Sequence, residues 1–143
     1  PIVGWDGSLS SLQFIGPEGD KKMLKGGRKL GRLIPVHGQQ GASRIVIAEG
    51  FATAATLAEA EPEALTLAAI DAGNLKSVAV AARERFPAAE IVLAADADAK
   101  GIKNARAAAI AAAGLVAVPN FPPGAEGSDW NDFAALQRKG GAS

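Results

Sequence analysis

The chain has 143 residues, of which 48% are hydrophobic and 21% are charged, with equal numbers of basic and acidic residues. This composition is typical of one folded domain with a single core, and it argues against a disordered chain. The absence of cysteine excludes disulfides and thiolate zinc sites, so a metal would be held by oxygen atoms or by His37, the single histidine.

The basic residues are gathered in one stretch. Residues 21–44 hold seven of the fifteen basic residues and no acidic one, so the rest of the chain has a net charge of minus seven. A basic segment beside an acidic body attracts a polyanion and concentrates divalent cations elsewhere. A solvated basic hairpin without a partner is the simpler alternative.

The first part of the chain has short alternating runs, such as residues 9–14, broken by Gly-Pro-Glu-Gly and Lys-Gly-Gly turns. This pattern predicts a short basic β-meander over residues 1–43. From residue 44 onward, apolar runs alternate with Ala-rich helical stretches, which is typical of βαβ units. We therefore predict an α/β fold, with a parallel sheet flanked by helices over residues 44–143. The expected strands are 44–49, 65–71, 90–96 and 115–119, and the expected helices are 52–60, 75–86 and 100–113, with a shorter one after residue 128.

No run approaches the roughly eighteen apolar residues of a membrane-spanning helix, and the start PIVGWDGSLS lacks the features of a signal peptide. We therefore expect a cytoplasmic protein without a membrane partner. The first residue is Pro1 and not Met, which suggests a piece of a longer protein.

Three acidic residues fall at the carboxyl ends of predicted strands, namely Glu49, Asp71 and Asp96. In an open parallel sheet these ends form the edge where ligands bind. Asp98 follows Asp96 by two residues, which directs both carboxylates to the same side. Such carboxylates repel each other unless a cation neutralises them, and Mg²⁺ prefers carboxylate oxygens. The pattern predicts a magnesium site. Asp71 fits a structural role at least as well, because it lies in a turn sequence in which Asn74 could cap the next helix.

Three motifs carry acidic residues, namely Ile45-Val-Ile-Ala-Glu49-Gly50, Asp96-Ala-Asp98 with Gly101 soon after it, and Gly127-Ser-Asp129-Trp-Asn131-Asp132. They resemble those of the Toprim family, which occurs in primases, topoisomerases and some nucleases and recombination proteins. The resemblance implies a Toprim-type, Rossmann-like sheet. It also implies that Mg²⁺ or Mn²⁺ is held by Glu49, Asp96, Asp98 and Asp129, and that Glu49 is a general base for nucleotide addition.

Two stretches, Glu49-Gly-Phe-Ala-Thr-Ala-Ala-Thr56 and Ile70-Asp-Ala-Gly-Asn-Leu75, most resemble those of primases from plasmids, phages and integrating elements. Replicative bacterial primases match less well, because Thr53 and Asn131 stand where those enzymes have acidic residues. Upstream, the basic stretch resembles the strand and turn that face the template and the nucleotide phosphates in primases. That resemblance implies nucleic-acid or nucleotide binding by Lys22, Lys25, Arg28 and Lys29, and basic side chains suit phosphate contacts on physical grounds as well.

These features predict a primase catalytic core that makes RNA primers on single-stranded DNA by Mg²⁺-dependent transfer from ribonucleoside triphosphates. A helicase or a relaxase, fused or associated, is an expected partner. The chain contains no tyrosine, which excludes a complete topoisomerase because that enzyme needs a tyrosine nucleophile. Two alternatives stay open, namely a nucleic-acid-binding Toprim module without turnover and a Toprim nuclease.

Several candidates also have a structural interpretation. Asp96, Asp98 and Asp129 stand before predicted helices, where Asp is a favoured N-cap. Trp130 is expected in the core, and His37 is expected to be a structural residue on a strand. Lys100 and Lys103 either touch phosphates or cover an exposed helix face.

Overall fold

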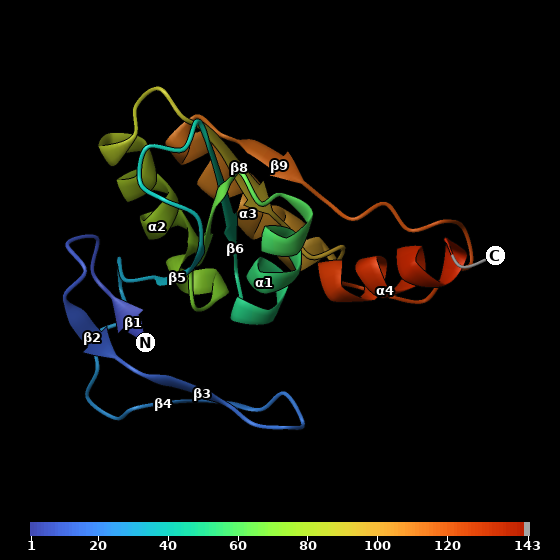
Figure 1. Ribbon diagram of the computed structural model, residues 1–143, viewed down its shortest axis with the longest axis horizontal. Coiled ribbons are helices and arrows are strands. Elements are labelled where there is room, and N and C mark those ends of the chain that lie inside the picture. Colours follow the sequence, from blue (N-terminus) through green and yellow to red (C-terminus); the bar gives the residue numbers. More distant parts are fainter. Residues whose placement is uncertain (142–143) are drawn as a thin grey trace.

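A five-stranded sheet with the order β5-β7-β6-β8-β9 forms the centre of the molecule in the computed structural model, which describes residues 1–141 (Figure 1). Strands β6, β7, β8 and β9 run parallel, as predicted, whereas β5 pairs antiparallel with β7 at one edge. The central strands are buried because helices cover both faces, which explains their continuous apolar sequence. The strands are β5 (Ile34–His37), β6 (Arg44–Ala48), β7 (Leu65–Ala68), β8 (Glu90–Ala94) and β9 (Leu115–Ala117).

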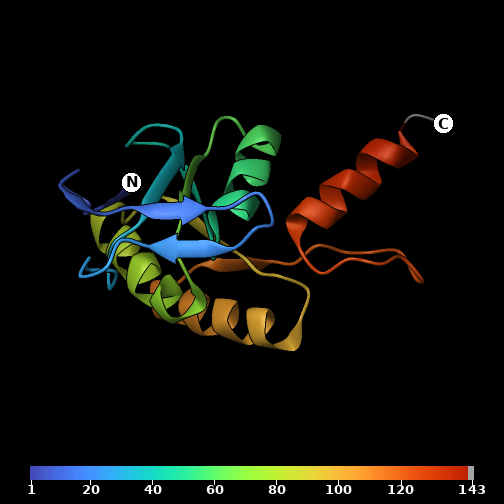
Figure 2. The same ribbon diagram turned by 90° about the horizontal axis from the view of Figure 1, so that it is seen from below.

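The helices divide the core into two layers. Alternate residues of β6 point to opposite faces, so Ile45 and Ile47 pack with α2 and α3 while Val46 and Ala48 pack with α1. Figure 2 shows α1 on one side of the sheet and α2 and α3 on the other. Helix α4 projects from the body and buries none of its residues completely. The helices are α1 (Phe51–Ala60), α2 (Ala72–Arg85), α3 (Ala99–Ala112) and α4 (Trp130–Gly140).

The predicted basic β-meander consists of two separate hairpins. Strands β1 (Ile2–Val3) and β2 (Leu9–Ser11) form one antiparallel pair, and β3 (Gln13–Ile15) and β4 (Lys21–Met23) form the other. The next strand, β5, belongs to the large sheet, where Ile34 is buried. The first segment therefore contributes to the core of the second. A division into domains of residues 1–43 and 44–143 stays a prediction, and residues 142–143 lie outside the described part.

The predicted strands and helices of the α/β part are confirmed, with shifts at their ends. The largest shifts are of three residues and adjoin each other: β7 ends at Ala68 and not at residue 71, and α2 begins at Ala72 and not at Leu75. The reason is that Asp71 caps this helix by accepting a hydrogen bond from the Asn74 backbone N–H at 3.2 Å. Asn74 is thus not the cap, and it lies buried within the helix. Over residues 1–141, no helix combines the length and the apolar character needed to span a bilayer.

Candidate active site

Three of the four predicted metal ligands meet at the carboxyl edge of the sheet. Glu49 follows β6 and Asp96 lies just beyond β8, and these strands are neighbours in register, with Ala48 opposite Ala94. Asp129 precedes α4 and reaches the same place. A small cavity of about 130 Å³ lies between them, and it is lined by Glu49, Asp96, Asp129, Lys21, Gly50, Ala52, Thr53 and Asn131. The sequence prediction of an acidic cluster at this edge thus has a clear geometric basis.

Glycines allow the close packing around this cavity. A Cβ atom on Gly101 would lie 3.1 to 3.2 Å from atoms of Asp96, which is tighter than ordinary van der Waals contact. A Cβ atom on Gly50 would lie 3.0 Å from the Lys21 Nζ. The glycines of the two motifs therefore let α3 approach Asp96 and let a lysine approach the first turn of α1.

The electrostatics of the cavity favour a bound cation. Partial burial, followed by the negative charges of Glu49, Asp129 and Asp98, raises the pKa of Asp96 to about 6, while Lys21 acts in the opposite direction. A raised carboxyl pKa means that the folded protein disfavours the charged form. A divalent cation would remove this penalty by neutralising the repelling carboxylates.

The cluster is open, and it does not enclose an ion. Within residues 1–141, no three side chains of His, Asp or Glu are close enough together to form a preformed metal cage. Mg²⁺ usually keeps several waters and binds through one or two carboxylates. The donor set therefore fits a water-rich magnesium site, and it does not fit a closed structural site.

Asp98 differs from the other three predicted ligands. Its side chain caps α3 by accepting a hydrogen bond from the Gly101 backbone N–H at 2.7 Å, and it does not line the cavity. Asp129 also acts as a cap, since it accepts from the Asp132 N–H at 2.9 Å, yet it does line the cavity. Both residues are thus helix caps, as the sequence suggested. Asp129 is a cap and also lines the cavity, whereas Asp98 is a cap only.

Two contacts at the start of α4 hold Asp129 near the sheet. Trp130 donates from its indole Nε1 to the Ala95 carbonyl at 3.0 Å, and the Thr56 hydroxyl donates to Asn131 Oδ1 at 2.5 Å. Trp130 is half-buried and packs against the core, so the expectation of a core residue is only partly met. These contacts tie α4 to β8 and α1.

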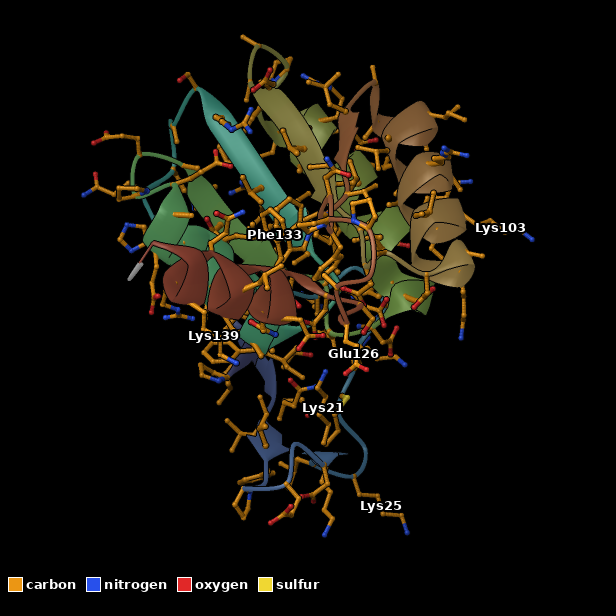
Figure 3. All side chains as sticks on the ribbon, turned by 90° about the vertical axis from the view of Figure 1, so that its right-hand side faces the viewer. Lys21, Lys25, Lys103, Glu126, Phe133 and Lys139 are labelled. Atoms are coloured by element: carbon orange, nitrogen blue, oxygen red, sulfur yellow. The ribbon has the colours of Figure 1, made fainter. Side chains whose placement is uncertain are left out.

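Sequence reasoning missed Lys21 as a residue of the site. Successive side chains of a strand alternate, and Met23 packs against the core, so Lys21 also faces the body while Lys22 faces outward. Figure 3 shows Lys21 between the hairpin and the body, whereas Lys25 points away. The apolar Met23 within a basic run is the signal that could have identified Lys21.

The other basic residues differ in their surroundings. The side chain of Lys22 is 80% exposed, with its Nζ 3.9 Å from Asp20. Lys25 and Arg28 are exposed as well. Lys29, in contrast, forms an ion pair with Asp71 at 2.5 Å. Lys100 and Lys103 lie on the exposed face of α3, and His37 is an exposed residue of β5 whose ring nitrogen lies 3.0 Å from the Pro62 carbonyl.

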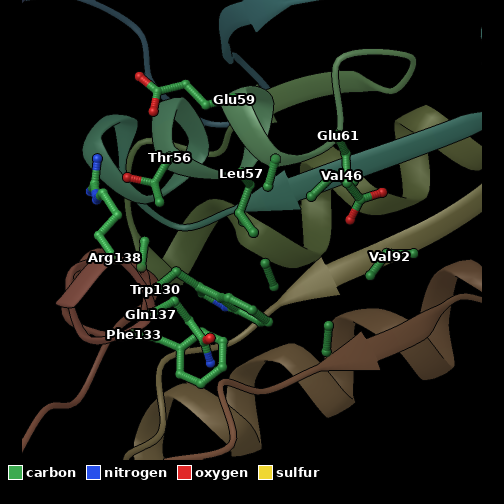
Figure 4. A pocket seen from close by; sticks show the side chains of 14 residues that line it. Val46, Thr56, Leu57, Glu59, Glu61, Val92, Trp130, Phe133, Gln137 and Arg138 are labelled. Carbon is green, nitrogen blue, oxygen red and sulfur yellow. The ribbon is translucent and has the colours of Figure 1, made fainter. Parts of the chain in front are cut away.

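A second hollow, of about 400 Å³, lies between α1, α4 and the sheet, and Figure 4 shows the side chains that line it. Val46, Leu57, Trp130 and Phe133 give it an apolar wall. Although it is larger than the acidic cavity, it does not include the acidic motif residues. Because only the smaller cavity holds the acidic motif residues, we take it as the candidate active site.

Comparison with known proteins decides the family. The family described as Toprim domain matches residues 44–142. The chain belongs to the Toprim domain family. Similar curated proteins include two named DNA primase TraC from Escherichia coli. One is 39% identical over 136 residues, covering 87% of this chain and 13% of that protein. The other is 36% identical over 148 residues, covering 95% and 10%. The chain thus spans only about a tenth of the length of these relatives, and the predicted resemblance to Toprim domains of primases is confirmed.

Solved structures confirm the predicted fold class. The primase fragment of the bacteriophage T7 primase-helicase protein aligns with a TM-score of 0.70 at 24% identity, covering 94% of this chain and 56% of that one. A T7 primase domain from a complex with lagging-strand DNA polymerase, an RNA/DNA hybrid and dTTP aligns with a TM-score of 0.68 at 24% identity, covering 96% and 71%. Because 94% and 96% of this chain are covered, the two alignments include more than the Toprim match at residues 44–142.

Proposed function

We propose that this Toprim chain is the catalytic core of a primase, which joins ribonucleotides into an RNA primer on a single-stranded DNA template. The observation that carries the proposal is the acidic cavity of Glu49, Asp96 and Asp129 with Lys21 of the β3–β4 hairpin facing it. Carboxylates that bind a cation, next to a basic segment that binds phosphates, are what nucleotidyl transfer on a polyanion requires. The similarity to DNA primases named TraC supports the same activity.

Glu49, Asp96 and Asp129 would hold Mg²⁺ or Mn²⁺ in this proposal, with Asp98 close enough to add its charge. The bound ion would supply charge neutralisation for the phosphates and the leaving pyrophosphate. Glu49 is the proposed catalytic residue, and it would accept the proton of the 3′-hydroxyl as this oxygen forms its bond to the α-phosphorus. Lys21 would contact a nucleotide phosphate, since its ammonium group already faces the cavity.

Primer synthesis tests the proposal directly. The natural gene product is incubated with a single-stranded template and labelled ribonucleotides, and incorporation is measured with Mg²⁺, with Mn²⁺ and with a chelator. We expect incorporation with either ion and its complete loss after chelation, because the carboxylates alone cannot stabilise the transferred phosphate. Metal-dependent cleavage of the template without incorporation would favour the nuclease alternative. Template binding without either reaction would favour a binding module.

A second experiment tests whether Lys22 of the β3–β4 hairpin, together with Lys25 and Arg28 just after it, binds DNA. Replacing Lys22, Lys25 and Arg28 by Ala is expected to weaken binding of the 143-residue chain to single-stranded DNA and to flatten its salt dependence. Three lost phosphate contacts should reduce the slope of log affinity against log salt by about two, given roughly 0.7 per contact on single strands. Fluorescence anisotropy over a salt series measures this slope.

The matched control removes the same number of charges elsewhere, through Lys76→Ala, Arg85→Ala and Arg106→Ala on the exposed faces of α2 and α3. We expect this control to keep the parental slope. Equal slopes for both triple variants would mean that net charge, and not the hairpin, governs binding.

The proposed partners follow from this activity. They are the single-stranded DNA template, ribonucleoside triphosphates and a fused or associated helicase or relaxase, in the cytoplasm of a cell that carries a plasmid or another mobile element. Copurification from such cells, followed by mass spectrometry, would identify the protein partner.

A further inference from the structure

Residues 28–32 are the part of the basic stretch that follows the β3–β4 hairpin, and they are called the basic segment below. One buried side chain binds this segment to the Toprim part. Asn74 of α2 is only 1% exposed. Its amide Nδ2 donates to the Arg32 carbonyl at 2.7 Å and to the Ala69 carbonyl at 2.9 Å, and its Oδ1 accepts from the Gly31 N–H at 2.7 Å. A buried amide with three such bonds strongly favours one position of the segment, because any displacement would leave polar groups unpaired.

Asp71, one turn before Asn74, makes a second connection to the same segment. One carboxylate oxygen caps α2, and the other forms the ion pair with Lys29. The side chains of Lys29 and Asp71 are 46% and 39% exposed, so this pair is weaker than the buried bonds of Asn74. Together, the two residues connect the carboxyl end of β7 to the backbone and to a side chain of the basic segment.

The turn just before Asp71 has a strained backbone. Ile70 is buried and has a φ of 80°, which is unfavourable for a β-branched residue. Its neighbours on both sides belong to the connection, because Ala69 accepts from Asn74 and Asp71 binds Lys29. Such strain persists only where the surrounding contacts hold it. The contacts of Asn74 and Lys29 therefore hold this turn in its strained conformation, at the same edge of the sheet as Glu49.

We propose that Asp71 and Asn74 are positioning residues, which hold the basic segment at the carboxyl edge of the sheet and so keep the hairpin with Lys21 over the acidic cavity. The expected effect on DNA binding rests on the proposed function, whereas the contacts of Asp71 and Asn74 do not depend on it. It also assigns Lys29 to this connection and not to contact with DNA.

The segment transmits its position to the hairpin through further bonds. The Ser10 hydroxyl donates to the Arg28 carbonyl at 2.8 Å, which joins residues 28–32 to β2. The Leu24 N–H, just after β4, donates to the Leu12 carbonyl at 2.9 Å, between β2 and β3. A segment released from Asn74 and Asp71 would leave Lys21 without a fixed distance to the cavity.

The variant Asp71→Asn tests the proposal, because Asn is an equally good helix cap but cannot pair with Lys29. Hydrogen exchange of the 143-residue chain should become about threefold faster at residues 28–32 and unchanged in β6 and β8. Single-stranded DNA binding should weaken about threefold, although the variant removes a negative charge. Simple electrostatics, or a Lys29 that contacts DNA, predicts the opposite sign, namely tighter binding. Tighter or unchanged binding together with unchanged exchange would overturn the proposal.

Variants of Lys29 and Asn74 complete the test. In hydrogen exchange at residues 28–32, Lys29→Gln alone, and combined with Asp71→Asn, should match Asp71→Asn alone, since all three lose the same ion pair. Lys29→Arg should keep the parental behaviour. Asn74→Ala should speed exchange of the Gly31 amide at least tenfold, and parental exchange there would contradict the proposal. If the parent chain binds no single-stranded DNA, the proposed function fails, while the exchange results still decide whether these residues hold the segment.

Discussion

Glu49→Gln is expected to lower primer synthesis by the natural gene product by at least about a hundredfold, and to change template affinity by no more than about twofold. The substitution keeps the size and hydrogen-bonding shape of the side chain but removes its charge. A residue that acts as a general base or as an electrostatic partner in the transition state contributes about this much to the rate. Binding should persist because the phosphate contacts come from the basic hairpin.

The assay compares incorporation of labelled ribonucleotides with template affinity on the same preparation. Glu84→Gln is the matched control, since Glu84 is an exposed residue of α2 that does not line the acidic cavity, and it should behave as the parent. Synthesis retained by Glu49→Gln would remove Glu49 from the catalytic set. If the parent itself made no primers, the binding-module and nuclease alternatives would be preferred.

Asp96→Asn is expected to weaken binding of Mg²⁺ or Mn²⁺ by at least about tenfold, because Asp96 lines the cavity with Glu49 and Asp129 and feels the charge of both. Isothermal titration of the 143-residue chain measures this affinity. Asp98→Asn should have a smaller effect, of about threefold, since Asp98 caps α3 outside the cavity and Asn can replace it as a cap. The double variant should bind metal at least about thirtyfold more weakly than the parent, since the two losses multiply. Unchanged metal binding by the double variant would contradict the assignment of the site.

Asp96→Asn should also make the metal-free chain slightly more stable. At neutral pH the folded protein pays for a partly buried carboxylate that is repelled by Glu49 and Asp129, and this is why the pKa of Asp96 is raised. A neutral Asn removes the repulsion, and after screening by solvent the gain should be up to about 1 kcal/mol. Thermal unfolding without metal measures it. Lost metal affinity together with gained stability is what distinguishes a binding residue from a structural one, whereas destabilisation would indicate a structural role.

The sequence alone determined the parallel sheet and the place of its acidic edge. Both follow from local patterns, because apolar runs alternate with Ala-rich helices and because Glu49 and Asp96 come directly after two of those runs. Parallel strands end at the same edge, so this placement needed no knowledge of contacts. The capping alternatives for Asp98 and Asp129 were visible for the same reason, since a cap depends on residues only three positions apart.

Only the tertiary structure decided which residues reach the acidic edge from elsewhere. Lys21 joins Glu49 across 28 positions of sequence, and Asn74 binds the backbone of Arg32 across 42. Strand β5 leaves the predicted meander for the large sheet because Ile34 finds a buried place beside β7. These contacts depend on the packing of distant segments, and periodicity within a short window does not encode that packing. The sequence thus located the acidic chemistry, and the packing of the basic segment determined which lysine faces it and what holds that segment in place.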